Sequence, residues 1–421
     1  MAKYVVKQSG PLRGEVFISG AKNAVLPLMA AALLAEEECI IRDVPMLRDV
    51  AFMKEILASH GAEVTELEEN VLAIETNDIT STEAKFELVN KMRASILIMG
   101  PLLARKGKAR IPLPGGCAIG ARPIDLHLKG LEALGAVITV NNEEGYVEAV
   151  AGPQGLIGDT IYLDFPSVGA TENIMMAAVL AQGTTYLENA AEEPEIVDLA
   201  NFLNKMGAKI KGAGTDTIKI EGVDKLHGAK HTVIPDRIEA GTFMLAAAIT
   251  RGAIHITNVV PDHLKPIIAK LRECGVRIEV GDEEMIVRGD LGPHTATDIK
   301  TLPYPGFPTD IQSPFMTYLA TVEGSSTVIE TVFENRFMHV AQLNKMGASI
   351  EAMGNKAVIR GNAKLRGCQV MATDLRAGAA LVLAGLVAEG ETEISEIYHI
   401  ERGYEKFIEK FEKLGASITK I

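Results

Sequence analysis

The sequence contains few cysteines, no basic run and no long apolar segment, and each of these absences excludes a class of protein. The four cysteines are scattered and form no C-x-x-C pair, so the sequence indicates neither a zinc site nor a disulfide framework. The formal net charge is −13 at pH 7, and no stretch is rich in Lys or Arg, which argues against nucleic acid or an anionic membrane as a partner. We therefore expect any anionic ligand to be bound by a local group of cations.

The longest apolar run, from Ala24 to Ala35, is too short to span a bilayer. The first residues also lack the basic and then apolar pattern of a signal peptide. We therefore predict a cytoplasmic protein without a membrane partner. Histidine, cysteine and glutamate do not occur together at the spacing of a metal site, so we predict neither a metal nor a cofactor. Nothing in the sequence indicates an obligatory protein partner.

A sequence motif of about five residues occurs six times at a nearly constant spacing. Each copy has a glycine in its second position. These residues are Gly61, Gly135, Gly207, Gly275, Gly347 and Gly415. The steps between them are 74, 72, 68, 72 and 68 residues. The chain of 421 residues is therefore predicted to contain six copies of one unit of about 70 residues, grouped in two globular domains of three units each.

Each unit has the pattern of two helices with several strands. An amphipathic helix runs up to each repeated glycine, which acts as its C-terminal stop, and a strand follows. Earlier in the unit lies an almost entirely apolar helix, as in residues 173–182 and 242–249, and such a helix is expected to be buried on every side. The predicted fold class is therefore α/β. No strand followed by G-x-G-x-x-G opens a helix, which argues against a simple doubly wound fold.

Cations recur at the predicted start of the buried helices. The equivalent positions in the six units are Lys22, Arg93, Gly169, Arg237, Asp310 and Arg376. A cation at a helix N-terminus is opposed by the helix dipole, so its repetition indicates that a bound anion outweighs this cost. The other helix series carries a second set, Arg48, Arg122 and Arg402. Together the two sets predict a polyanionic ligand.

Asp310 is the only carboxylate at these equivalent positions. One explanation is that it is an ordinary N-cap of a helix. The alternative follows from its surroundings, because a carboxylate among cations is held ionised and suits a general base that accepts a proton from a hydroxyl.

The segment 113–123 combines the thiol of Cys117 and the guanidinium of Arg122 with three glycines that can act as hinges. A lone cysteine is often a small buried hydrophobe. A neighbouring cation lowers the pKa of a thiol, however, so the segment also fits a mobile loop with a reactive cysteine. The residues alone leave both alternatives open.

These motifs resemble the enolpyruvyl transferases, and in particular those that act on UDP-N-acetylglucosamine. The resemblance extends over all six units, and its most specific segments are residues 20–24, 92–95, 117–127, 167–171, 235–239, 307–310, 334–339, 373–376 and 398–404. It implies a two-domain inside-out α/β barrel. The implied domains are residues 22–234, which carry the loop, and residues 1–21 with 235–421, which include the N-terminal strand.

The resemblance also implies an activity. The enolpyruvyl group of phosphoenolpyruvate would pass to the 3′-hydroxyl of UDP-N-acetylglucosamine with release of phosphate, as the first committed step of peptidoglycan precursor synthesis. Cys117 would donate a proton and would be the residue that the epoxide fosfomycin alkylates, and Asp310 would be the base. Lys22, Arg122 and Arg402 would hold phosphoenolpyruvate.

The resemblance assigns further substrate contacts. Arg336 and Arg376 would add to the cationic site, and Arg93 would belong to the anion-binding shell. The other expected contacts are Asn23, Pro123, Asp125, Leu126, His127, Ser167, Val168, Gly169 and Asp374. Among them, residues 122–123 and 125–127 would flank the uracil, and residues 167–169 would contact the sugar and diphosphate. Many relatives carry a lysine where this chain has Phe165, which puts one diphosphate contact in doubt.

Two other functions are compatible with parts of the pattern. The 5-enolpyruvylshikimate-3-phosphate synthases share the repeat and the Lys/Arg positions but have no cysteine in this loop. A non-catalytic nucleotide-sugar sensor on the same scaffold would bind UDP-N-acetylglucosamine and release no phosphate. Because acid, base and cations are all retained, the sequence favours the transferase.

Overall fold

A computed structural model describes residues 2–89, 92–113 and 124–421. Contacts between residues divide the chain into two compact units. The terminal unit comprises residues 2–19 and Pro235–Ile421, and the middle unit comprises the described residues from Gly20 to Ile234. No helix in the described ranges is both long enough and apolar enough to cross a membrane.

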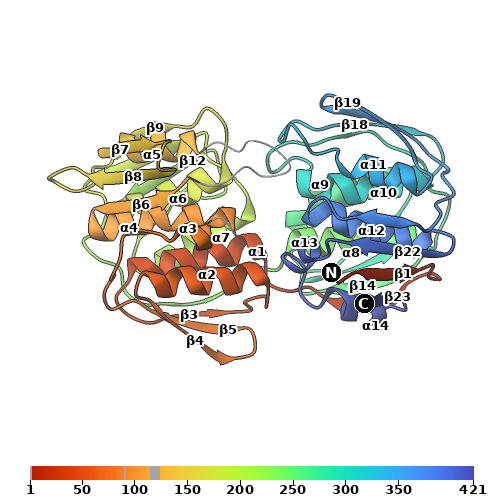
Figure 1. Cartoon of the computed structure of the whole chain (residues 1–421), viewed down its shortest axis with the longest axis horizontal. Helices are drawn as coiled ribbons and strands as arrows, with labels where there is room; N and C mark the ends of the chain where they lie inside the picture. Colours follow the sequence, from red (N-terminus) through yellow and green to blue (C-terminus); the bar gives the residue numbers. More distant parts are fainter. Residues whose placement is uncertain (1, 90–91, 114–123) are drawn as a thin grey trace. The chain divides into compact units, whose positions relative to one another are not determined.

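The middle unit alternates helices and strands in the order that the repeat predicts (Figure 1). Its helices are α1 (Lys22–Ala31), η1 (Ala32–Leu34), α2 (Arg48–Ser59), α3 (Phe86–Val89), η2 (Arg93–Ile98), α4 (Met99–Lys106), α5 (Asp125–Ala133), α6 (Val168–Ala178) and α7 (Pro194–Lys205), where η marks a 3₁₀ helix. Its strands are β3 (Cys39–Arg42), β4 (Glu63–Glu68), β5 (Val71–Glu75), β6 (Lys108–Pro112), β7 (Ala136–Asn141), β8 (Tyr146–Ala151), β9 (Thr160–Tyr162), β10 (Thr184–Glu188), β11 (Lys209–Lys211), β12 (Thr217–Glu221) and β13 (Lys230–Thr232).

The sheets of the middle unit share one pairing scheme. In the sheet β13-β3-β5-β4, β13 runs parallel to β3, and the other pairs are antiparallel. The sheet β11-β12-β10-β9 repeats this arrangement with β9 as the parallel strand. In β6-β8-β7 the parallel strand is reduced to a single bridge between Glu83 and Arg110. Because β13 comes from the end of the unit and β3 from its start, their pairing closes the unit on itself.

The terminal unit follows the same repeat. Its helices are α8 (Arg237–Ile249), η3 (Pro261–Leu264), α9 (Lys265–Glu273), η4 (Thr309–Ile311), α10 (Gln312–Thr321), α11 (His339–Lys345), α12 (Leu375–Val387), α13 (Tyr398–Glu401) and α14 (Phe407–Lys413). Its strands are β1 (Tyr4–Lys7), β2 (Arg13–Phe17), β14 (Ala253–Thr257), β15 (Arg277–Val280), β16 (Glu284–Arg288), β17 (Ile299–Lys300), β18 (Ser325–Ile329), β19 (Ser349–Met353), β20 (Lys356–Arg360), β21 (Gln369–Met371), β22 (Glu391–Ser395) and β23 (Ser417–Lys420).

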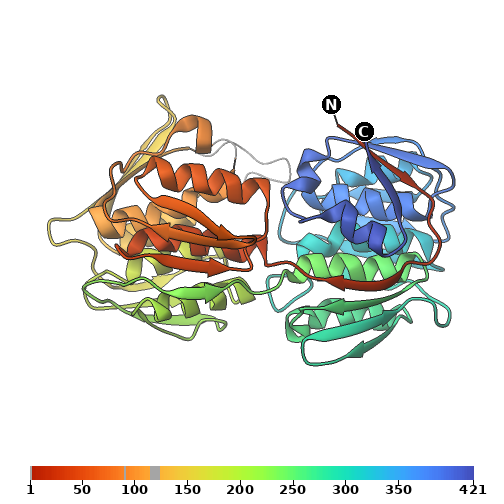
Figure 2. The same ribbon diagram turned by 90° about the horizontal axis from the view of Figure 1, so that it is seen from below.

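The first two strands complete sheets that are otherwise built from residues that follow the middle unit in the sequence. β1 lies between β22 and β23 and is antiparallel to both, and β2 runs parallel to β14. The two chain ends consequently lie side by side (Figure 2), with the Lys3 amide donating to the Ile421 carbonyl at 2.8 Å. The middle unit is therefore inserted into the terminal unit between β2 and α8.

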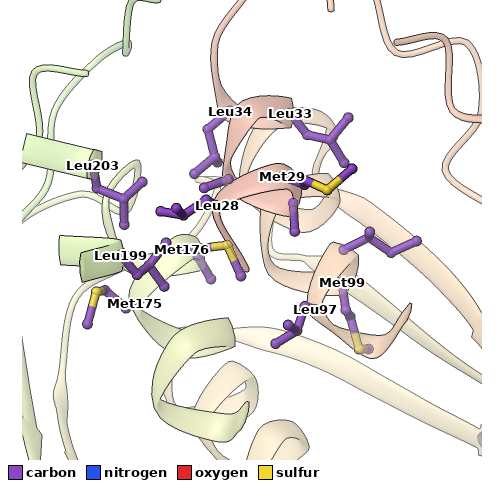
Figure 3. Packing of buried hydrophobic residues seen from close by; sticks show 14 of the residues in the cluster. Leu28, Met29, Leu33, Leu34, Leu97, Met99, Met175, Met176, Leu199 and Leu203 are labelled. Atoms are coloured by element: carbon purple, nitrogen blue, oxygen red, sulfur yellow. The ribbon is translucent and has the colours of Figure 1, made fainter. Parts of the chain in front are cut away.

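Apolar helices fill the interior of each unit, and the sheets lie around them (Figure 1). Every residue of α8 from Ile238 to Ile249 is buried. In the core of the middle unit, Leu28 of α1 lies close to Met176 of α6 and Leu199 of α7 (Figure 3). Full burial of one such side chain stabilises the folded state by about 1.5–3 kcal/mol. Both predicted buried helices are present, but α6 begins at Val168 and ends at Ala178, so the predicted range 173–182 is shifted, and Gln182 is exposed.

The repeated glycines end helices, as predicted. The φ angles of the six are 102°, 88°, 103°, 94°, 100° and 96° in chain order, a conformation that glycine adopts at little cost. Helices lie inside and sheets outside, as the α/β inside-out architecture requires. The strands of the described residues form six separate sheets and no closed barrel, because edge strands such as β4 and β15 pair on one side only.

Candidate active site

The cations of the first set lie at helix starts, as the sequence predicts. Lys22 is the first residue of α1, Arg93 of η2 and Arg237 of α8, and Arg376 is the second residue of α12. Asp310 lies within η4, where Pro308 occupies the N-cap position. The explanation of Asp310 as an ordinary N-cap is therefore wrong. At each of these helix starts, outward amides and the positive end of the dipole favour an anion.

Lys22 is held by a buried carboxylate. Its Nζ lies 2.9 Å from Oδ2 of Asp49, whose side chain is 1% exposed in the first turn of α2. A buried ion pair of this kind restrains the ammonium, because separating two buried charges costs free energy. Arg48 is the first residue of α2, and Asn23 follows Lys22 in an exposed position. Sequence reasoning missed Asp49, which carries no signal beyond its place at a helix start.

A second group in the middle unit joins α5, η2 and the start of α6. Burial, and next the charge of Arg93, lower the pKa of His127 to about 4, so the ring is neutral at pH 7. A Cβ on Gly169 would lie 3.2 Å from Cε1 of His127, so the imidazole packs directly on this glycine. Arg93, His127 and the start of α6 therefore form one cluster.

The ring of His127 explains why one member of the cation series has no side chain. Gly169 occupies the position at which four of the other units carry Lys or Arg, and a side chain there would displace the imidazole. Ser167 is the N-cap of α6 and accepts from the Ala170 amide at 3.4 Å, and Val168 is the first residue of the helix.

The remaining predicted residues of the middle unit lie at the start of α5 and before α6. Asp125 is exposed in the first turn of α5, and Leu126 is half-buried and packs on the core. Phe165 is 41% exposed. Its aromatic ring offers no cation for a diphosphate.

In the terminal unit, Asp310 links two buried arginines. Its Oδ1 lies 2.8 Å from Nη2 of Arg336, and its Oδ2 lies 3.1 Å from Nε of Arg376. The arginine side chains are 5% and 2% exposed, whereas that of Asp310 is 24% exposed. Charge-assisted hydrogen bonds to both oxygens hold this carboxylate in a fixed orientation at the start of α10.

Arg376 presents an unsatisfied donor. Its Nη1 is buried without a hydrogen-bond partner, and the guanidinium lies over the ring of Tyr404 at 5.1 Å. Burial lowers the pKa of Arg376, but Tyr404 and Asp310 outweigh it and raise the pKa above its usual value. A permanently charged, buried N–H without an acceptor is costly, and an anionic ligand would remove that cost.

Glu330 contacts the Asp310 and Arg336 pair through Thr309, and sequence reasoning missed it. It is 2% exposed, and its Oε2 accepts from Oγ1 of Thr309 at 2.9 Å. The same Thr309 Oγ1 accepts from Nη1 of Arg336 at 3.0 Å. The Glu330–Thr309 pair therefore positions Arg336 beside Asp310. Glu330 follows β18 directly and has no motif that marks it.

Two other predicted residues of the terminal unit lie at helix ends. Asp374 is the N-cap of α12 and accepts from the amides of Arg376 at 2.9 Å and Ala377 at 3.0 Å, so it fixes the start of the helix that carries Arg376. Arg402 is half-buried and follows α13. Burial of His399 lowers the pKa of its ring, and the charge of Arg402 lowers it further.

Cys117, Arg122 and Pro123 lie outside the described residues, so the two explanations of Cys117 stay open. The described site residues form two groups in the middle unit, one around Lys22 and one around His127, and one group in the terminal unit, around Asp310. Among the residues that the structure describes, no group of three or more His, Cys, Asp or Glu could hold a metal ion.

Comparison with known proteins gives full-length matches. Residues 6–411 match the family model described as EPSP synthase (3-phosphoshikimate 1-carboxyvinyltransferase). The chain is 62% identical over 418 residues to UDP-N-acetylglucosamine 1-carboxyvinyltransferase 1 of Caldanaerobacter subterraneus subsp. tengcongensis, with 99% of each chain covered. It is 58% identical over 417 residues to the UDP-N-acetylglucosamine 1-carboxyvinyltransferase of Finegoldia magna, covering 99% of this chain and 98% of the relative.

Solved structures show the same fold. The enolpyruvyl transferase NikO from Streptomyces tendae aligns with a TM-score of 0.90 at 26% identity, over 100% of this chain and 98% of its own. EPSP synthase from Acinetobacter baumannii aligns over 100% of both chains with a TM-score of 0.79 at 19% identity, which supports the fold alone.

Proposed function

The chain belongs to the EPSP synthase (3-phosphoshikimate 1-carboxyvinyltransferase) family, and on this premise we propose that it transfers the enolpyruvyl group of phosphoenolpyruvate to the 3′-hydroxyl of UDP-N-acetylglucosamine. The reaction releases phosphate and is the first committed step of peptidoglycan precursor synthesis. The observation that carries the proposal is the 62% identity, over 99% of both chains, to a relative named for this activity. Because both substrates are metabolites of the cytoplasm, we place the reaction there.

The proposed chemistry needs an acid, a base and a cationic site. A proton is added to the methylene carbon of phosphoenolpyruvate while the sugar hydroxyl attacks C2 and loses its proton. The resulting tetrahedral intermediate then returns a proton from the methyl carbon and expels phosphate, which gives the enol ether. We assign Cys117 as the acid and Asp310 as the base.

The geometry around Asp310 supports its role as the base. Arg336 and Arg376 contact its two oxygens and favour the carboxylate over the acid. The buried Nη1 of Arg376 is a donor suited to an anionic substrate.

The other predicted residues supply binding. Lys22, fixed by Asp49, would hold phosphoenolpyruvate together with Arg122 and Arg402. The nucleotide sugar would contact the groups around His127 and the start of α6, whose amides and neighbouring Arg93 suit a diphosphate. The complete proposed set of substrate contacts is Lys22, Asn23, Arg93, Arg122, Pro123, Asp125, Leu126, His127, Ser167, Val168, Gly169, Asp310, Arg336, Asp374, Arg376 and Arg402.

We also propose that residues 22–234 form one domain and that residues 1–21 with 235–421 form the other. The division of contacts, which separates the chain at Gly20 and Pro235, supports this assignment. No partner beyond the two small-molecule substrates is required by the proposal, neither a protein nor a nucleic acid nor a membrane.

Phosphate release tests the proposal. The purified chain is mixed with phosphoenolpyruvate and either UDP-N-acetylglucosamine or shikimate 3-phosphate, and free phosphate is measured over time. We expect release only with the nucleotide sugar. Release only with shikimate 3-phosphate would assign the activity of the EPSP synthases, whose description the family model carries. Binding of UDP-N-acetylglucosamine without any release would instead identify a sensor.

A further inference from the structure

A fully buried side-chain amide connects α6, α4 and η2 next to His127. Asn173 of α6 is 0% exposed. Its Oδ1 accepts from the Gly100 amide of α4 at 2.6 Å, and its Nδ2 donates to the Ile96 carbonyl of η2 at 3.0 Å. A backbone N–H can only donate and a carbonyl can only accept, so these two contacts determine which end of the Asn173 amide is oxygen.

The orientation of Asn173 determines where His127 carries its proton. Nδ2 of Asn173 lies 3.1 Å from Nδ1 of His127. Because Nδ2 has only hydrogens to offer, Nδ1 must be the acceptor in this contact. The ring is neutral, since burial lowers its pKa to about 4, and a neutral imidazole has one N–H. The proton must therefore be on Nε2.

The Nε2 edge of the ring lies at the start of α6. A Cβ on Gly169 would be 3.3 Å from Nε2. Gly169, which lies against this edge, and Arg93, whose charge lowers the pKa of the ring, are both among the residues expected to bind the sugar nucleotide. An N–H on Nε2 thus adds a donor to a region in which backbone amides and a guanidinium already favour acceptor oxygens.

We infer that Asn173 is a positioning residue that fixes His127 as a hydrogen-bond donor, through Nε2–H, to an oxygen of the nucleotide substrate. This inference rests on the proposed function, because it takes the nucleotide from there. It excludes His127 as a proton acceptor during turnover. The oxygen belongs either to a carbonyl of the base or to the diphosphate.

The same unit contains a histidine with the opposite arrangement. His60 is 0% exposed, and its Nδ1 lies 2.7 Å from the carbonyl oxygen of Ser81. A carbonyl can only accept, so His60 carries its proton on Nδ1, and burial lowers its pKa as well. His60 lies outside the site and is therefore a matched control for His127.

Nuclear magnetic resonance of the full chain with ¹⁵N-labelled histidine tests the proton positions directly. We expect His127 to show a protonated Nε2 and a bare Nδ1 between pH 6 and 8, and His60 to show a protonated Nδ1 and a bare Nε2 at pH 8. The variants H127Q and H60Q assign the two sets of signals by their loss. A proton on Nδ1 of His127 would overturn the inference, whatever the enzyme activity.

The variant N173D tests whether Asn173 sets this state. A carboxylate still accepts from the Gly100 amide, but it cannot donate to His127, so a proton should appear on Nδ1 of the ring. A bare Nδ1 in N173D would show that Asn173 is not the cause. If N173D does not fold, the spectrum of the unaltered chain and the binding measurements below remain decisive.

Calorimetric binding of UDP-N-acetylglucosamine, UMP and uridine identifies the acceptor. H127F removes the donor, and we expect about tenfold weaker binding of UDP-N-acetylglucosamine, as for a lost hydrogen bond that leaves its partner unpaired. H127Q keeps an N–H donor and should retain more affinity than H127F, and H60Q should bind as the unaltered chain does. A loss that persists with uridine assigns a base carbonyl, and a loss confined to the phosphorylated ligands assigns a phosphate oxygen.

Equal affinity of H127F and the unaltered chain for all three ligands would overturn the inference. Failure of the proposed function looks different, because the unaltered chain would then release no phosphate from phosphoenolpyruvate in the presence of UDP-N-acetylglucosamine. The proton positions of His127 and His60 can be measured in either case.

Discussion

Replacement of Asp310 by asparagine separates the chemical role of this carboxylate from its structural one. In D310N one oxygen becomes an NH₂ group, so the side chain can accept from Arg336 or Arg376 but not from both. The two contacts are 2.8 and 3.1 Å long, and each guanidinium is nearly buried. A hydrogen bond to a charged group contributes about 1.5–3 kcal/mol. Because Asp310 is 24% exposed, we expect the free energy of unfolding to fall by about 2 kcal/mol.

The expected loss of turnover is larger than this structural cost. Removal of a general base lowers turnover by about 10²–10⁴-fold. This corresponds to about 3–5 kcal/mol in the activation free energy. Phosphate release measures kcat, and calorimetry measures the affinity for UDP-N-acetylglucosamine, which we expect to be largely kept because the Arg93 and His127 group is unaltered.

Asp290 provides the matched control for this experiment. It also joins two arginines, with Arg288 Nε at 2.9 Å and Arg13 Nη2 at 3.4 Å, and its side chain is 16% exposed. It lies outside the candidate site. D290N should therefore keep full turnover. Near-normal turnover in D310N would assign the base to another residue, and an equal loss in D290N would show that the effect is general rather than catalytic.

Three further predictions concern the described core, the nucleotide site and the cysteine. G169A should keep the free energy of unfolding within about 1 kcal/mol, since alanine favours a helix. It should weaken UDP-N-acetylglucosamine binding in calorimetry, because the alanine Cβ would lie 3.2 Å from the His127 ring. Unchanged affinity would contradict the packing of His127 on Gly169. Burial raises the pKa of Glu239 from 4.5 to about 7, although Lys410 opposes the shift. The folded state therefore favours the protonated carboxyl, and the stability that this protonation contributes is fully present below pH 4.5 and is lost as the pH rises through 7. E239Q should therefore gain about 2 kcal/mol relative to the unaltered chain between pH 5 and pH 7.5 in denaturant unfolding, and a pH-independent difference would refute this. C117D should retain enolpyruvyl transfer and resist fosfomycin, because aspartate can donate a proton but cannot open the epoxide as a thiolate does. C117A has no proton to donate and should lose turnover. Equal inactivity of both folded variants would mean that the nucleophilic sulfur is required.

The sequence by itself was enough to determine the repeat, the glycines that end helices and the positions of the helix-start cations. These features depend on neighbours within a few residues. A glycine that ends a helix, such as Gly207 with its φ of 103°, needs only its own backbone conformation. A cation at the first residue of a helix, such as Lys22, is likewise read from the local pattern. The family resemblance then supplied roles for these positions.

Only the tertiary structure decided which side chains meet. Asp310 and Arg376 are 66 residues apart in sequence, and His127 and Asn173 are 46 apart. No local pattern marks such a pair, because the contact depends on how buried helices of different repeats pack. For the same reason Asp49 and Glu330 had no recognisable signal, although they orient Lys22 and Arg336. The proton position on His127 likewise depends on an amide whose orientation is set by the backbone of two other helices.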